Sequence, residues 1–274
     1  MTNKEKYGEF CKITYVPIYS QSWWMDAVCR AENWNVWLCE KNGVVVAPMP
    51  YYLENRNGYR YITKASLTQN NGIIFRYPEG AKEIARQNFE EKVINAACEF
   101  VESLKVNVYE QQYHFEFENW LPFYWNGYTA LTWYTYVLAN IDSKEAAWDN
   151  MSAKDRKNIK KGQRNGVFKE GLDYKKFYEE YEKVFLKQGL CCPFSFDIWE
   201  KLYLATKLQD SGKIMYAEDA QGNISSLLFL VWDEKSVYHL LGGSIPEFQH
   251  LETYNALTWK GIKFALEKVG GYKQ

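Results

Sequence analysis

A repeated order of elements constrains the fold of this chain of 274 residues more than any other feature. In residues 34–54 two apolar runs flank Asn42-Gly43, a pair that supplies the positive φ angles of a tight hairpin turn. The same design returns in residues 213–232 around Gln221-Gly222. After each hairpin come a short strand, a loop and a long amphipathic helix. The pattern predicts two copies of one α/β unit.

The long helices extend the comparison between the copies. Apolar residues at helical spacing predict the first helix over Glu83–Leu104, and a strand over residues 106–115 follows it. The second helix is expected over residues 253–268, before Gly270-Gly271. We therefore place the two domains at residues 1–140 and 141–274. The sequence stops where the next strand of the second copy is expected, so we predict that this last strand is missing.

A strongly basic stretch, residues 151–166, lies between the copies and holds six cations around one acid. Ser152 and Asp155 have the spacing of a capping box, and Gly166 can end the predicted helix. Ile159 is expected to face the core. Because acids do not alternate with the cations, we predict a local anion site rather than a merely solvated surface. Its expected members are Arg156, Lys160, Lys161 and Arg164.

Composition excludes several classes of function. A net charge of −1 and a pI near 6.4 argue against coating of nucleic acid by a whole domain, so no duplex DNA partner is expected. No apolar run approaches the roughly 20 residues that span a bilayer, and the first ten residues contain no apolar signal core, which predicts a cytoplasmic protein. The cysteines and histidines show no CxxC or HExxH spacing, so no catalytic metal is expected.

Three stretches carry a resemblance to a known family. They are NWLPFYWNGY with WYTYVLANI, then KDRKNIKKGQRNGV, and finally YHLLGGSIPEF with LTWKGIKFALEKVGGYKQ. Over nearly its whole length the chain resembles acetyltransferases related to the Fem peptidyltransferases. The resemblance implies an α/β (α+β) fold of tandem GNAT-like domains, with mixed central sheets flanked by helices. In that family a strand of the form FDFEGS follows the last helix.

The resemblance also implies the reaction, which is transfer of an acyl or aminoacyl group to an amine. Our leading hypothesis is an N-acyltransferase that uses acetyl-CoA or another acyl-CoA, with an amine-bearing small molecule or a cell-wall precursor as acceptor. The basic stretch would then hold phosphates of a nucleotide-linked acceptor, a tRNA end or a cofactor. One alternative is an aminoacyl-tRNA-dependent enzyme that builds peptidoglycan bridges, although no coiled-coil arm is seen between Leu172 and Lys213. Another is a non-catalytic module that binds a sugar nucleotide or a peptide.

A GNAT site normally holds pyrophosphate in a loop of the form Q/R-x-x-G-x-G/A at a helix N-terminus. The matching residues begin at Gln249, but Glu252 and Tyr254 replace the glycines, and a carboxylate there would repel pyrophosphate. The donor-binding residues implied by the resemblance are Gln249, Thr253, Tyr254 and Asn255. The candidate catalytic residues are His239 and Glu252, either of which can accept the ammonium proton. A packed histidine and a glutamate that complements the helix dipole are the structural alternatives.

Overall fold

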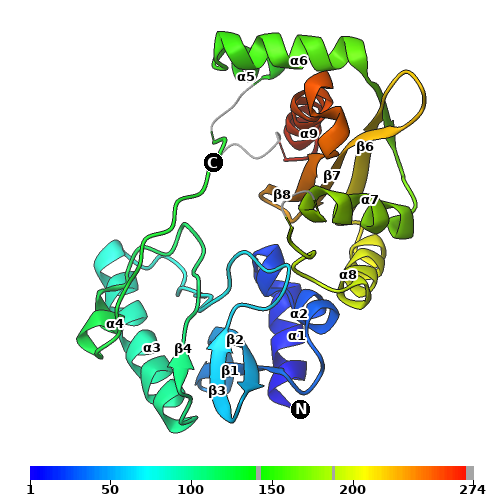
Figure 1. Cartoon of the computed structure of the whole chain (residues 1–274). Coiled ribbons are helices and arrows are strands. Elements are labelled where there is room, and N and C mark those ends of the chain that lie inside the picture. Colours follow the sequence, from blue (N-terminus) through cyan, green and yellow to red (C-terminus); the bar gives the residue numbers. More distant parts are fainter. Residues whose placement is uncertain (140–142, 187–188, 270–274) are drawn as a thin grey trace. The chain divides into compact units, whose positions relative to one another are not determined.

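The computed structural model describes residues 1–139, 143–186 and 189–269 (Figure 1). The chain divides into two compact units, Met1–Tyr136 and Val137–Gln274, which are described separately below. Each unit contains one four-stranded sheet with helices packed against it. The expected α/β class, with two sheets flanked by helices, is confirmed. Within the described residues, no helix combines the length and the apolar character needed to cross a membrane.

The first unit is built on a mixed sheet with the strand order β1-β2-β3-β4. The predicted hairpin is confirmed, because Lys41 pairs with Val44 across Asn42 and Gly43, which have φ angles of 52° and 76°. The pairs β1–β2 and β2–β3 are antiparallel, whereas β3–β4 is parallel. The elements are α1 (Asn3–Ile13), η1 (Ile18–Ser20), α2 (Ser22–Val28), β1 (Trp34–Lys41), β2 (Val44–Arg56), β3 (Tyr59–Thr63), α3 (Glu83–Ser103), β4 (Val108–Tyr109) and α4 (Leu121–Trp125).

Helix α3 connects the parallel strands β3 and β4 and ends within one residue of its predicted end. Its apolar side, which includes Val93, Ile94 and Ala97, packs on Ala47 and Met49 of β2. The strand predicted after it over residues 106–115 is wrong in length, since only Val108–Tyr109 form β4. The physical reason is that β3 ends at Thr63, so the residues beyond Glu110 have no strand beside them.

The second unit has the strand order β5-β6-β7-β8, and every described pair is antiparallel. A hairpin joins β6 to β7 through Asp219–Asn223, where Gly222 has a φ angle of 85°, as the Gln221-Gly222 pattern predicted. The elements are α5 (Lys144–Asp149), α6 (Ala153–Asn165), β5 (Val167–Glu170), α7 (Tyr174–Leu186), α8 (Phe196–Leu208), β6 (Gly212–Glu218), β7 (Ile224–Trp232), β8 (Val237–Ser244), η2 (Pro246–Leu251) and α9 (Thr253–Val269).

Helices cover both faces of the second sheet. Leu228 and Leu230 of β7 pack on Leu257 of α9. Phe229, which lies between them, points to the other face and contacts Phe177 of α7 and Trp199 of α8. This alternation follows from the two-residue period of a strand, which makes a strand buried on both faces continuously apolar.

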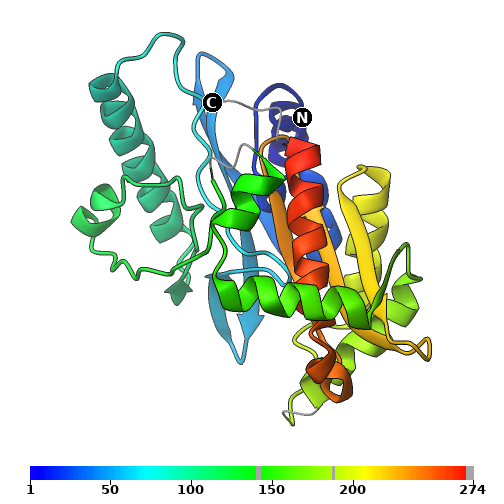
Figure 2. The same cartoon turned by 90° about the horizontal axis from the view of Figure 1, so that it is seen from above.

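Helix α6 is the basic helix predicted from the sequence, and it crosses α9 (Figures 1 and 2). The Ser152 hydroxyl caps it by accepting the Asp155 N–H, and Ile159 packs beside Ala147 and Trp259 as expected. Gly166 ends the helix, but with an extended φ of −130° rather than in the left-handed conformation. The glycine is needed for another reason, because a Cβ there would lie 2.7 Å from Cγ2 of Thr253.

The order of hairpin, strand and helix therefore occurs twice, as β1-β2-β3-α3 and as β6-β7-β8-α9. Two helices precede the hairpin in each unit, α1 and α2 in the first and α7 and α8 in the second. The second unit differs by having α5, α6 and β5 before those helices, with β5 on the outer side of β6, whereas the first unit has β4 beside β3. Superposition of the two hairpins and relationship to GNAT domains remain predictions. The residues around Gly270-Gly271, on which the prediction of a missing strand depends, lie outside the described residues.

Candidate active site

A bulge in β8 brings together two residues that a regular strand would separate. His239 lies opposite Leu230 and Leu241 lies opposite Phe229, so that Leu240 is an extra residue in β8. Residues three apart in a regular strand point to opposite faces. The bulge instead places His239 and Gly242 on the face of the sheet that α9 covers.

On that face His239 meets Tyr254, the second residue of α9. Nε2 of the imidazole lies 2.9 Å from the Tyr254 hydroxyl oxygen. Gly242 lies under this pair, since a Cβ at Gly242 would be 2.5 Å from Nε2 and 2.9 Å from the hydroxyl oxygen. The absence of a side chain at Gly242 is therefore what allows His239 and Tyr254 to approach.

The environment determines where the protons of this pair reside. Partial removal of solvent lowers the pKa of His239 below its ordinary value of 6.5, and burial raises the pKa of Tyr254 to about 12. At neutral pH the phenol is therefore protonated and the imidazole is neutral. The two groups form one hydrogen bond, in which the hydroxyl donates to Nε2 when Nδ1 carries the imidazole proton and Nε2–H donates to the hydroxyl oxygen in the other tautomer.

A second tyrosine approaches from the opposite face of the sheet. Tyr181 of α7 is buried, and burial raises the pKa of its hydroxyl to about 12, an effect that nearby Cys192 and Tyr254 reinforce and a hydrogen bond with the Gly242 backbone opposes. Tyr181 thus reaches the same glycine as the His239–Tyr254 pair. We call His239, Gly242, Tyr254 and Tyr181 the β8 site.

The edge of β8 adds backbone groups to this site. Among the described strands, β8 pairs only with β7, so its other edge is not covered by a strand. Two hydroxyls, a neutral imidazole and backbone amides are thus close together along one strand. Such a set can donate hydrogen bonds to a developing oxyanion and can accept a proton from an attacking amine.

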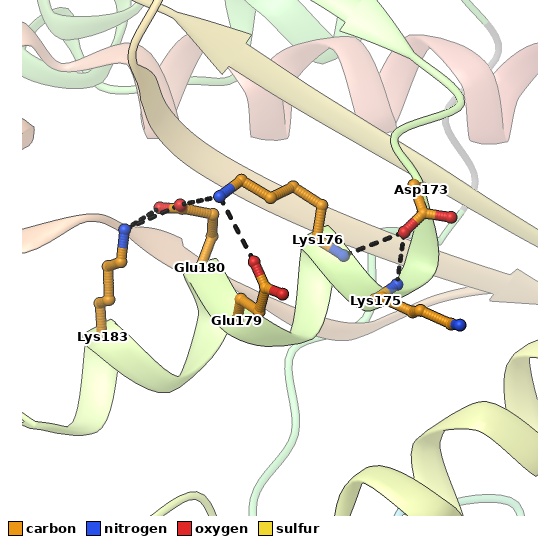
Figure 3. Close-up of polar contacts among 6 residues, drawn as sticks. All are labelled: Asp173, Lys175, Lys176, Glu179, Glu180 and Lys183. Atoms are coloured by element: carbon orange, nitrogen blue, oxygen red, sulfur yellow. Dashed lines mark hydrogen bonds and ion pairs between the residues drawn. The ribbon is translucent and has the colours of Figure 1, made fainter.

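Within helix α7, which carries Tyr181, the buried Glu180 carboxylate forms ion pairs with two half-exposed lysines of the same helix (Figure 3). Glu180 is 6% exposed, and its carboxylate lies 2.7 Å from the Lys183 ammonium and 3.0 Å from the Lys176 ammonium. Burial alone would raise the pKa of Glu180, but the two lysines hold it below its ordinary value. Asp173 accepts the backbone N–H groups of Lys175 and Lys176 at the start of the helix. Glu180 is therefore an ionised structural group.

The second predicted catalytic residue, Glu252, does not join the β8 site. It takes a left-handed φ of 61° directly before α9, and its carboxylate accepts a 2.6 Å hydrogen bond from the Asn255 side chain. Thr253 is buried, and its hydroxyl lies 2.9 Å from that of Ser225. Glu252, Thr253 and Asn255 thus stabilise the start of α9. Gln249 lies exposed in η2, and only Tyr254 of the predicted donor-binding residues joins His239.

The predicted anion site also divides into two groups. Arg156 donates to the backbone carbonyls of Trp148, Asp149 and Met151, so its guanidinium closes the end of α5. Lys160 is exposed above the Trp148 ring, 5.9 Å from its centroid. Lys161 and Arg164 are exposed and form no ion pair with the described part of the chain. In that part of the chain, no three His, Cys, Asp or Glu side chains are grouped so as to hold a metal ion.

Tyr181 is the member of the site that the sequence pattern did not single out. Phe177, Tyr181 and Val184 have the spacing of a buried helix face, which indicates packing and not chemistry. The glycine pair Gly242-Gly243 in β8 allows another group to approach the backbone closely. The partner that approaches it could not be identified without the position of α7.

Among comparisons with known proteins, only the comparison with solved structures found a likeness to this chain, and that likeness is one of fold. The sequence matches no protein-family model and no curated protein. The crystal structure of FemX is similar to this chain with a TM-score of 0.65 and 12% sequence identity, over 98% of this chain and 85% of FemX. The structure of L-PGS from Bacillus licheniformis is similar with a TM-score of 0.51 and 13% identity, over 98% of this chain and 73% of L-PGS. The chain therefore has a Fem-like fold.

Proposed function

We propose that this protein is an aminoacyl transferase of the Fem type, which moves an aminoacyl group from a charged tRNA to an amine. The observation that carries the proposal is the likeness of fold to FemX over 98% of this chain. The sequence resemblance to the Fem peptidyltransferases agrees with it. An amine on a cell-wall precursor or a small molecule would be the acceptor.

The β8 site offers groups that suit this chemistry, a phenol and an imidazole within hydrogen-bond distance of each other. The amine nitrogen attacks the ester carbonyl carbon and forms the new C–N bond. Its proton passes to the Tyr254 oxygen while the Tyr254 proton moves to Nε2 of His239. The C–O bond to the ribose then breaks, and the ribose oxygen leaves with a proton that the same pair returns. The Tyr181 hydroxyl and the β8 backbone amides would stabilise the oxyanion.

The helix entrance favours this donor over acyl-CoA. Residues Pro246–Leu251 form a 3₁₀ helix where an extended pyrophosphate-binding loop was expected. The Glu252 carboxylate stands at the positive end of α9, which is the place that a pyrophosphate would need. Both features weaken the acetyl-CoA hypothesis, which remains the alternative.

The test measures transfer of a radiolabelled amino acid from charged tRNA, and of acetyl from acetyl-CoA, to a lysine-bearing cell-wall precursor. We expect transfer from tRNA. His239→Gln should lower it at least a hundredfold, since proton transfer by a positioned group contributes about 10²–10⁴ in rate. The matched control is His250→Gln, because His250 is exposed in η2 and its ring lies within hydrogen-bond distance of the Glu247 carbonyl oxygen in the same turn, at 3.1 Å.

Two outcomes contradict the proposal. Transfer from acetyl-CoA alone would identify an N-acyltransferase. Binding of the precursor without transfer from either donor would identify a non-catalytic module.

A further inference from the structure

The outer side of α6 presents exposed cations that have no ion-pair partner in the described part of the chain. Ile159 and Gly162 point inward, and Arg156 is bound to backbone carbonyls. The remaining cations are exposed, and none forms an ion pair with the described part of the chain. We call them the basic face: Lys154, Lys157, Lys160, Lys161 and Arg164.

The single acid of the helix does not neutralise this face. The Asp155 carboxylate accepts a 2.7 Å hydrogen bond from the Ser152 hydroxyl and stands at the helix N-terminus, where it complements the dipole. The lysines and the arginine therefore repel one another, at a small cost that a bound polyanion would remove.

The shape of the basic face indicates the kind of anion. Ten residues separate Lys154 from Arg164, which corresponds to about 15 Å along a helix. A single diphosphate is shorter than this, whereas several successive phosphates of a nucleic-acid strand extend along such a line. A membrane surface fits less well, because a helix that lies on lipid exposes an apolar side, and Ile159 of α6 is buried against α9.

The position of the basic face relates it to the β8 site. Helix α6 rests on the first turn of α9, where a Cβ at Gly162 would lie 2.2 Å from the Glu252 carbonyl oxygen. Asn165 donates to the Leu251 carbonyl at 3.2 Å. Tyr254 belongs to that same turn of α9. Phosphates bound to the basic face would thus be held by α6, which packs directly on the first turn of α9, where Tyr254 lies.

We infer that the basic face binds the phosphate backbone of the donor tRNA, outside the aminoacyl end that reacts. The inference rests on the proposed function, which supplies a charged tRNA as donor. It names a surface, whereas the proposed function concerns the reacting groups.

The experiment measures binding of uncharged tRNA by fluorescence anisotropy at several salt concentrations. The variant combines Lys157→Gln, Lys161→Gln and Arg164→Gln, all at exposed positions, and leaves Lys160 over Trp148 unchanged. The matched control combines Lys64→Gln, Lys92→Gln and Lys207→Gln, which removes the same charge from exposed positions elsewhere. Lys161→Glu serves as a second variant. Thermal midpoints establish that each variant is folded.

We expect the basic-face variant to bind tRNA at least tenfold more weakly than the control. The slope of log affinity against log salt should become shallower by about 2–3, since each phosphate contact contributes about 0.7–0.9. Unchanged tRNA affinity, or an equal loss in the control, would overturn the inference. The inference would also be overturned if the variant lost affinity only for phosphatidylglycerol vesicles, or only for a free nucleoside diphosphate, and kept its affinity for tRNA.

A second readout separates this inference from the proposed function. Transfer from charged tRNA should fall at least fivefold relative to transfer from a small aminoacyl-adenosine donor that has no RNA body. His239→Gln should instead abolish transfer from both donors while tRNA affinity is kept. Tight tRNA binding through the basic face, without transfer to any amine, would refute the proposed function alone. Equal losses with both donors would refute the tRNA surface alone.

Discussion

At the scale of the residue, the protonation of His239 decides whether Tyr254 can pass on a proton. A neutral Nε2 accepts the Tyr254 hydroxyl proton, whereas an imidazolium has no free acceptor. The Gly242 backbone beneath the pair keeps the two groups together without adding a competing polar side chain. The reaction should therefore depend on the pKa of one imidazole.

We expect this pKa to lie below 6.5, because desolvation disfavours the charged ring. Transfer should stay high near neutral pH and fall as the pH drops through the pKa of His239. The folded state should also lose stability as the pH falls from about 6.5, since the unfolded chain then binds the proton more readily. An NMR titration of the His239 ring, compared with the acid limb of the rate profile, checks this. A ring that titrates above 6.5 would contradict it.

At the scale of the element, the close packing of α6 against α9 depends on Gly162. In an exposed helix, replacement of glycine by alanine stabilises by about 1 kcal/mol. Here the new Cβ would lie 2.2 Å from the Glu252 carbonyl oxygen and 2.9 Å from the Ala256 Cβ, so backbone would have to move. We expect the free-energy cost of this steric clash to exceed the gain in helix propensity.

We therefore expect Gly162→Ala to lower the free energy of unfolding by about 1–3 kcal/mol, the usual range for an overpacked contact. Denaturant unfolding of the whole chain measures it. The adjacent Gln163→Ala is the control, because Gln163 is exposed and should change stability by less than about 0.5 kcal/mol. A Gly162→Ala variant as stable as the wild type would show that α6 can move away at no cost.

At the scale of the whole molecule, each unit has its own core. Ile94 is fully buried against β2 in the first unit, and Leu257 is fully buried against β7 in the second. We expect two thermal transitions in calorimetry. Ile94→Ala and Leu257→Ala should each cost about 2–5 kcal/mol and should each shift a different transition. A single transition, or two that shift together in either variant, would contradict this.

Much of the fold follows from the sequence because it depends on local interactions. The Asn42-Gly43 turn, the helix α3 and the Ser152 cap are determined by backbone preferences and by the spacing of apolar residues within a few turns. The basic helix and the inward position of Ile159 follow from the same periodicity. These features need no knowledge of distant segments.

Only the tertiary structure decided the composition of the candidate site. The bulge at Leu240 depends on the register between β7 and β8, and it alone brings His239 and Gly242 to one face. The paths of α7 and α9 bring Tyr181 and Tyr254 to that glycine and engage Glu252 with Asn255 instead. Likewise, the Arg156 side chain of α6 donates to backbone carbonyls at the end of α5 because of where α5 ends. Register and packing arise from contacts between segments far apart in the chain, which no local pattern of residues records.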